Sequence, residues 1–198
     1  MDIKDKHRKK LLEAIVYFAS NVKNPTKMMI YKMLAELDFR HFEQTGLSVT
    51  NSVYVAFEKG PVPKKLHDEI TQDKKLVFPD DFKEALSVQK EEFVDKKSGK
   101  DITKFTILPK RKADLSVFSP RQKKIMEEIA FIYRDSFATT ASKASHEYDK
   151  PWYKTIKKSG LGSVIDYLEQ ITHETPVTKE EAKELQKEAS AFKSNYNG

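Results

Sequence analysis

The N-terminal part of the chain carries two helical patterns of apolar side chains. Apolar residues between Leu11 and Ala19 recur three to four positions apart, which predicts an amphipathic helix over residues 5–20. Pro25 interrupts this pattern and suits the first turn of a second helix. We expect the second helix to end at Gly46, because glycine readily adopts the left-handed conformation of a helix cap.

The second helix has one apolar face. At 100° per residue, Ile30, Leu34, Leu37 and His41 fall within about 40° of one line along the helix. Asp38 flanks this line. We therefore expect this face to point into the core and the opposite face to lie in solvent. The opposite face carries Lys32, Glu36, Arg40 and Glu43.

An alternating pattern follows the second helix. Residues 53–58 alternate between Val or Phe and other side chains, which predicts a strand. Gly60 ends this strand. Pro61 or Pro63 then suits the first turn of a short helix.

Residues 85–109 contain two further alternating segments around Gly99, which predict two antiparallel strands joined by a turn. Ser119 precedes Pro120, and Gln122 stands three residues after the serine. This spacing is a capping box and predicts the start of a helix. We expect its inner face to carry Ile125, Ile129, Ile132 and Tyr133.

The C-terminal segment predicts a surface helix. Thr178 and Glu181 form a second capping box, and the residues that follow are helix formers with few large apolar side chains. The elements together predict an α+β fold: one mostly helical domain with a small antiparallel β-sheet and a C-terminal helical tail. We assign residues 1–174 to the domain and residues 175–198 to the helical extension.

Composition narrows the compartment and the chemistry. The chain has no cysteine, which excludes disulfides, thiolate zinc sites and cysteine nucleophiles. It has no apolar run of about 18 residues, and its N-terminal segment lacks the pattern of a cleaved signal peptide. We therefore expect a soluble, unexported protein of the cytoplasm.

Lys and Arg exceed Asp and Glu by 36 to 30, which gives a net charge of +6. Such a balance favours acidic partners, either nucleic acid or an acidic protein. The charges are largely interspersed, however, as on an ordinary solvated surface. The densest basic run, residues 104–112, alternates with apolar residues like an edge strand.

Few residues indicate reaction chemistry. Asp38 and His41 are three positions apart on a helix, so they can hydrogen bond or share a metal. His67 and His146 lack the spacing of further zinc ligands, and a structural Asp–His pair is the simpler interpretation. Nucleotide-binding glycine motifs and hydrolase motifs are missing. We therefore expect no enzyme activity, no metal and no cofactor.

Two features allow a structural or a binding role. Trp152 is the only tryptophan and follows Pro151, so it either closes the core or anchors an interface. Gly60 and Pro61 either form a turn or present a binding edge. Helices followed by a basic hairpin also match a winged helix-turn-helix coarsely, but residues 64–71 offer no clear DNA-reading face.

The chain resembles the Panacea domain family, also called SocA-like antitoxins or phage-associated GepA-like proteins. The resemblance lies in LDFRH at residues 37–41, the tyrosine of the predicted strand, GPVP at residues 60–63 and the later Ser-His and Pro-Trp pairs. It extends over about residues 11–156. Ala35 stands where a tyrosine is expected, and Asn51 where a glycine is usual. The residues that match the family pattern are Asp38, His41, Tyr54, Gly60, Pro61, Val62, His146 and Trp152.

The resemblance implies an antitoxin of a type II toxin-antitoxin pair, encoded by a bacterium or a phage, that neutralises a cognate protein toxin by direct binding. The matching residues either contact the toxin or hold the fold. Two other roles stay open. One is a proteolytic adaptor that delivers the toxin to a protease, and the other is a DNA-binding transcriptional regulator.

Overall fold

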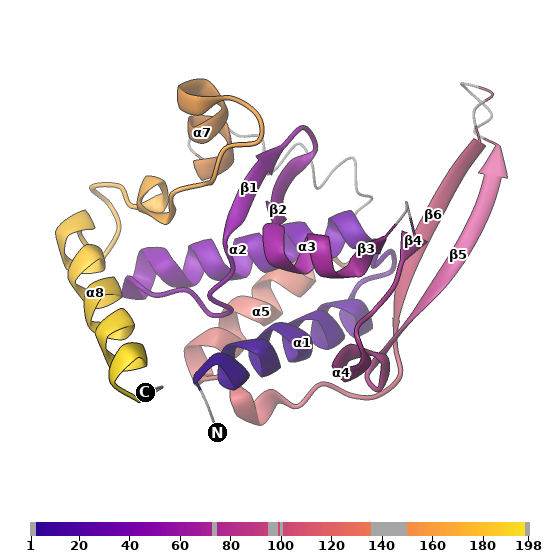
Figure 1. Cartoon of the computed structure of the whole chain (residues 1–198), viewed down its shortest axis with the longest axis horizontal. Coiled ribbons are helices and arrows are strands. Elements are labelled where there is room, and N and C mark those ends of the chain that lie inside the picture. Colours follow the sequence, from indigo (N-terminus) through magenta and orange to yellow (C-terminus); the bar gives the residue numbers. More distant parts are fainter. Residues whose placement is uncertain (1–2, 73–74, 95–98, 100, 136–149, 197–198) are drawn as a thin grey trace.

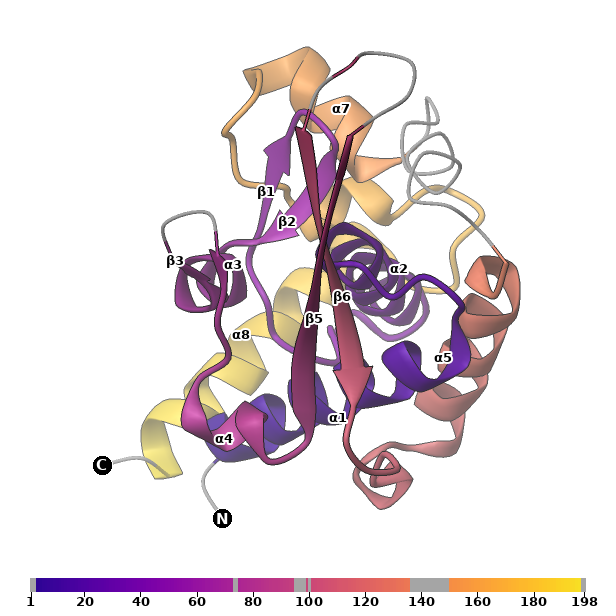
Figure 2. The same cartoon turned by 90° about the vertical axis from the view of Figure 1, so that its right-hand side faces the viewer.

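The computed structural model describes residues 3–72, 75–94, 99, 101–135 and 150–196. Helix α2 lies at the centre of the fold and packs against α1, α5 and β2. The β1–β2 hairpin and α7 lie on one side of α2, and α1 and α5 lie on the other (Figures 1 and 2). The main helices are α1 (Ile3–Asn21), α2 (Lys27–Thr45), α5 (Pro120–Tyr133), α7 (Pro151–Ser159) and α8 (Lys179–Tyr196).

The first two helices match the sequence predictions closely. Gly46 caps α2 with a φ of 70°, and its N–H donates to the Phe42 carbonyl at 2.8 Å. The start of α2 differs from the prediction, because Thr26 is the N-cap and Pro25 lies outside the helix. The Pro25 carbonyl instead accepts a hydrogen bond of 2.9 Å from the Ile107 N–H, which joins this turn to strand β6 (Asp101–Pro109).

Helix α2 is buried on more than one face. The predicted apolar line is in the core, but Lys32, expected in solvent, is only 1% exposed. Lys32 lines a narrow cavity with Pro61 and Trp152, because β2 and α7 cover this side of the helix. Burial lowers the pKa of Lys32 to about 8. The prediction of a solvated opposite face is therefore wrong at this position, while Glu36 and Arg40 keep partial exposure.

The GPVP segment forms a strand. β1 (Tyr54–Phe57) pairs antiparallel with β2 (Gly60–Pro63), so the predicted helix begins later than Pro61. Pro63 is the N-cap of α3 (Lys64–Ile70). Residues 162–165 add along the free edge of β1, where the Ile165 N–H donates to the Tyr54 carbonyl at 2.8 Å.

The predicted second hairpin is confirmed. β5 (Leu86–Val94) pairs antiparallel with β6 (Asp101–Pro109). Leu86 and Ile107 anchor its base in the core, whereas its outer part extends away from the helices (Figure 1). The shorter elements are β3 (Thr71–Gln72), β4 (Lys75–Leu76), α4 (Asp80–Lys83) and the 3-10 helices Leu115–Val117 and Tyr167–Gln170.

Helix α5 begins at the predicted capping box, in which Ser119 and Gln122 bond each other's backbone. Its inner face contains Ile125, Ile129 and Tyr133 as expected, but Ile132 is 51% exposed. The Ile132 side chain lines an open cavity instead of the core.

Helix α8 begins at the predicted Thr178–Glu181 capping box. It packs against the end of α2 through Ala182, which forms a small buried cluster with Phe42 and Ile171. The boundary at residue 174 stays a prediction. No helix within the described ranges is long and apolar enough to cross a membrane.

Replacing Gly46 with alanine tests the contact between α2 and α8. A Cβ at Gly46 would lie 2.9 Å from Leu185 Cδ1 and 3.1 Å from Ala182 Cα. Gly46→Ala therefore adds a steric clash to the cost of a positive φ, which is about 1–2 kcal/mol. We expect this substitution to lower the free energy of unfolding. The measurement is unfolding in urea, monitored by the fluorescence of Trp152.

Gly162→Ala is the matched control. Gly162 also has a positive φ, 85°, but nothing lies within 4 Å of its Cβ position. We expect Gly46→Ala to cost at least about 1 kcal/mol more than Gly162→Ala, as overpacking typically does. Equal losses would show that α8 does not press on the cap of α2.

Candidate functional site

The residues of the family pattern centre on the carboxylate of Asp38, which is fully buried on α2. This carboxylate accepts four hydrogen bonds from residues 49–54. The N–H groups of Val49 and Thr50 both donate at 2.8 Å, the Thr50 hydroxyl at 2.5 Å and the Tyr54 hydroxyl at 2.8 Å. Burial raises the pKa of Asp38, and the four donors oppose this effect.

These bonds fix how the chain leaves α2. The segment that supplies the donors turns back over the helix and continues directly into β1. Within it, Asn51 has a φ of 56° and is the only non-glycine residue with a positive φ among those described. Asparagine tolerates this conformation better than most side chains. A glycine, which the resemblance led us to expect at this position, would meet the same backbone requirement.

His41 does not pair with Asp38, so the expected Asp–His pair is wrong. Its Nδ1 lies 2.7 Å from the Leu47 carbonyl and its Nε2 lies 3.4 Å from Gln122 Nε2. The Gln122 Oε1 in turn accepts from Lys10 Nζ at 3.0 Å. Burial, chiefly, lowers the pKa of His41. His41 therefore acts as a neutral polar link between α1, α2 and α5.

Tyr54 and the GPVP strand are interior. The Tyr54 ring centroid lies 5.4 Å from that of Phe39 and 6.1 Å from that of Tyr167. Burial raises the pKa of Tyr54 well above its usual range. Gly60, with a φ of 125°, begins the buried strand that contains Pro61 and Val62. These four residues therefore hold the hairpin against α2.

Trp152 closes the same part of the core. Its Nε1 donates to the Phe57 carbonyl at 2.9 Å, and its ring packs with Ala35 and Tyr54. Of the two roles open from the sequence, the geometry matches core closure. His146 lies outside the described residues, so its placement stays a prediction.

A cavity of about 300 Å³ lies beside the segment that donates hydrogen bonds to Asp38. Residues 50–53 form one wall, and α1 and α3 form the others. His7, Arg8 and Lys65 line it, and no carboxylate does. Arg8 already bonds Glu69 at 2.7 Å. The sequence did not reveal this cavity, because its basic residues come from separate helices.

The described residues contain no group of three or more acidic or histidine side chains that could hold a metal ion. The arrangement around Asp38 consists of donors pointing at one buried carboxylate, and the Thr50 hydroxyl that contacts it is buried as well. These hydrogen bonds hold residues 49–53 and the β1–β2 hairpin against α2.

Comparison with protein families gives one match. A family model described as "Antitoxin SocA-like, Panacea domain" matches residues 30–153, more than half of the chain. No curated protein and no solved structure matches the chain.

Asp38→Asn tests the central carboxylate. The amide keeps one acceptor oxygen but turns an N–H₂ donor toward groups that also donate. Because buried polar groups without partners cost about 1–3 kcal/mol each, we expect a loss of about 3 kcal/mol in unfolding free energy. Tyr54→Phe removes a single donor and should cost about 1–2 kcal/mol. Asp38→Asn costing less than Tyr54→Phe would contradict the central role of the carboxylate.

The lowered pKa of His41 predicts a pH dependence of stability. An unfolded histidine titrates near pH 6.5, so below that pH the unfolded chain binds a proton that the folded chain resists. Stability should therefore fall as pH falls through the histidine range, from about 7 to 5. In His41→Gln the free energy of unfolding should fall less steeply over this pH range. Urea unfolding at a series of pH values measures it.

His173→Gln is the control for that measurement, because the His173 side chain is 91% exposed. It should leave the slope of stability against pH as in the wild type. A full wild-type slope in His41→Gln would rule His41 out as its source.

Proposed function

The chain belongs to the family of SocA-like antitoxins with a Panacea domain, and we propose that it neutralises a cognate protein toxin by binding it directly. We assign it to a type II toxin-antitoxin pair of a bacterium or phage, acting in the cytoplasm. The family match carries this proposal. The matched residues include the β1–β2 hairpin, most of α2, on which this hairpin is anchored, and the whole of α5.

The geometry supports neutralisation by occlusion. The described residues of the family pattern are buried or bonded inside the domain, so they shape a surface without forming most of it. A preformed surface loses little conformational freedom when a partner binds. Covering the active site or substrate surface of a toxin needs such a surface and no reaction by the antitoxin itself.

Large exposed apolar side chains give that surface candidate contacts. Such side chains are frequent anchors of protein interfaces when they are aromatic and surrounded by polar groups. They occur on the outer face of α5, at the tip of the β5–β6 hairpin and beside β1. The residues are Phe131, Ile132, Phe93, Val94, Ile102, Leu161 and Val164.

The DNA-binding alternative has less support. The expected reading helix is α3, which buries Leu66 and Ile70. Its exposed Lys64 is paired with Asp68 on the next turn. A helix of this length with a neutralised lysine offers few side chains for base edges.

Co-expression with the protein encoded by the adjacent gene tests the proposal. We expect that protein alone to arrest growth, and this chain to restore growth and to co-purify with it. A frameshifted copy of this gene is the control, since it shows that the protein and not its transcript is responsible. Restored growth without a complex would contradict direct neutralisation.

The same cells separate occlusion from delivery to a protease. Under occlusion the toxin level stays constant or rises when this chain is present, because the complex accumulates. A faster loss of toxin after synthesis is stopped would instead support the adaptor role. A truncation after Ala191 is a better probe of the tail than one after Val177, because Ala182 is part of a buried cluster.

A further inference from the structure

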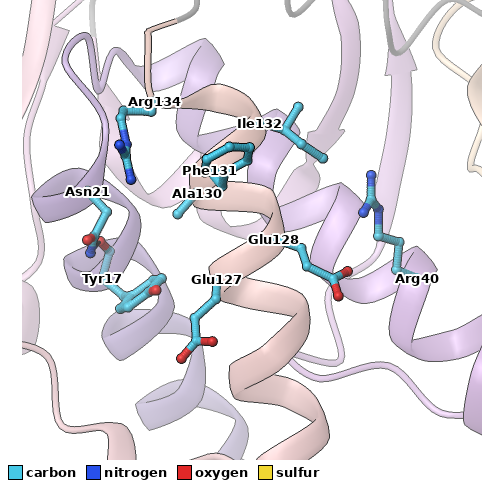
Figure 3. A pocket seen from close by; sticks show the side chains of 9 residues that line it. All are labelled: Tyr17, Asn21, Arg40, Glu127, Glu128, Ala130, Phe131, Ile132 and Arg134. Carbon is cyan, nitrogen blue, oxygen red and sulfur yellow. Dashed lines mark hydrogen bonds between the residues drawn. The ribbon is translucent and has the colours of Figure 1, made fainter.

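An open cavity of about 620 Å³ lies on the outer side of α5, between α1 and α2 (Figure 3). Tyr17 and Asn21 of α1 form one wall and Arg40 of α2 the other (Figure 3). Helix α5 supplies the floor between them. The α5 residues that line this groove, with Arg134 just beyond the helix, are Glu127, Glu128, Ala130, Phe131, Ile132 and Arg134.

The groove exposes apolar surface that the fold does not cover. Phe131 is 72% exposed, the largest fraction among the large apolar residues described, and Ile132 is 51% exposed. Burying a phenylalanine side chain is favourable, and the free protein leaves most of the Phe131 side chain in solvent.

The charges around these side chains are partly unpaired. Glu127 and Glu128, one turn before Phe131 and Ile132, form no ion pair within the described part of the chain. Arg40 is already paired with Glu36 at 2.9 Å. The Arg134 guanidinium lies 5.5 Å from the centre of the Phe131 ring. These two carboxylates thus border the apolar surface directly.

We propose that this groove binds an amphipathic helix of the toxin whose apolar side chains are flanked by lysine or arginine. A groove between helices with an apolar floor accepts the apolar face of another helix, and the carboxylates select basic flanking residues. This inference rests on the proposed function, and it names the surface and the partner chemistry.

The net charge of +6 does not oppose a basic partner segment. Charges farther away than about 10 Å are largely screened at 0.1 M salt. Within the groove lining, Arg40 is offset by Glu36. The two carboxylates of Glu127 and Glu128 are therefore opposed in this lining by Arg134 alone and give the local surface a negative balance.

Two other surfaces lack this combination. At the hairpin tip, Phe93 and Ile102 are exposed, but nearby Glu91 and Lys104 pair with each other at 3.6 Å. In the cavity beside residues 50–53, Arg8 is held by carboxylates of its own chain. Neither surface therefore indicates the chemistry of a partner, and both supply controls.

The test measures binding of the purified adjacent-gene protein to variants of the full chain. Phe131→Ser and the double variant Glu127→Lys/Glu128→Lys should each weaken binding at least about tenfold, as loss of an interface anchor does. Phe93→Ser tests the hairpin as the rival candidate contact, and Lys65→Glu is the charged control; if the groove is the interface, both should change binding less than about threefold. Thermal unfolding by Trp152 fluorescence should be unchanged, since all altered side chains are exposed.

Salt provides a second readout. Wild-type binding should weaken as salt rises from low to high concentration, and the double charge reversal should flatten or invert this dependence. A merely structural effect of the substitutions would leave the salt dependence in place.

A thiol placed beside the groove locates the contact independently of affinity. The chain has no cysteine, so Lys124→Cys on α5 carries a single reactive group. The complex should slow its reaction with a maleimide at least about tenfold, as burial in an interface core excludes reagent. Thr103→Cys on the β5–β6 hairpin should react with the maleimide at the same rate in the complex as in the free chain.

The outcomes are distinct. Wild-type affinity in the groove variants, with an unprotected Lys124→Cys, overturns the groove and leaves direct neutralisation standing. Protection of Thr103→Cys and weak binding by Phe93→Ser moves the interface to the hairpin. No binding by the wild-type chain overturns both the groove and the proposed function.

Discussion

The carboxylate of Asp38 is the interaction on which the rest of the structure depends. A buried charge is tolerated only when polar partners surround it, and all four donors here come from one short segment after α2. Forming these bonds therefore places the loop and the start of β1 at once. Tyr54 belongs to the same buried cluster as Trp152, so the carboxylate also helps to position α7.

The family pattern is thus largely a pattern of folding. Asp38, Tyr54, Val62 and Trp152 make contacts inside the domain, and each has a structural reason for its residue type. The specificity of partner binding is therefore left to exposed side chains, whose replacement does not disturb the buried contacts. Such a division suits the proposed antitoxin role, in which one common fold would carry different contact surfaces.

The sequence was sufficient for most elements, because periodicity and capping motifs act locally. It failed where a distant element decided the outcome. Lys32 is buried because β2 and α7 cover it, and Pro25 left the helix because its carbonyl pairs with β6. Pro61 pairs with Ala56 in the β1–β2 hairpin, and this pairing outweighs the preference of proline for the first turn of a helix. The donors to Asp38 were equally hidden, since they lie 11 to 16 residues away in the chain.

Helix α2 links the interior and the groove. Asp38 points toward the loop, while Arg40, two residues later, borders the groove. Because Asp38 bonds the loop and does not line the groove, we expect a defect at Asp38 to act on the groove through the stability of the whole domain. Changes at Phe131 or Glu128 act on exposed surface and leave the domain as it is. Loss of binding together with loss of stability therefore indicates the scaffold, and loss of binding alone indicates the contact surface.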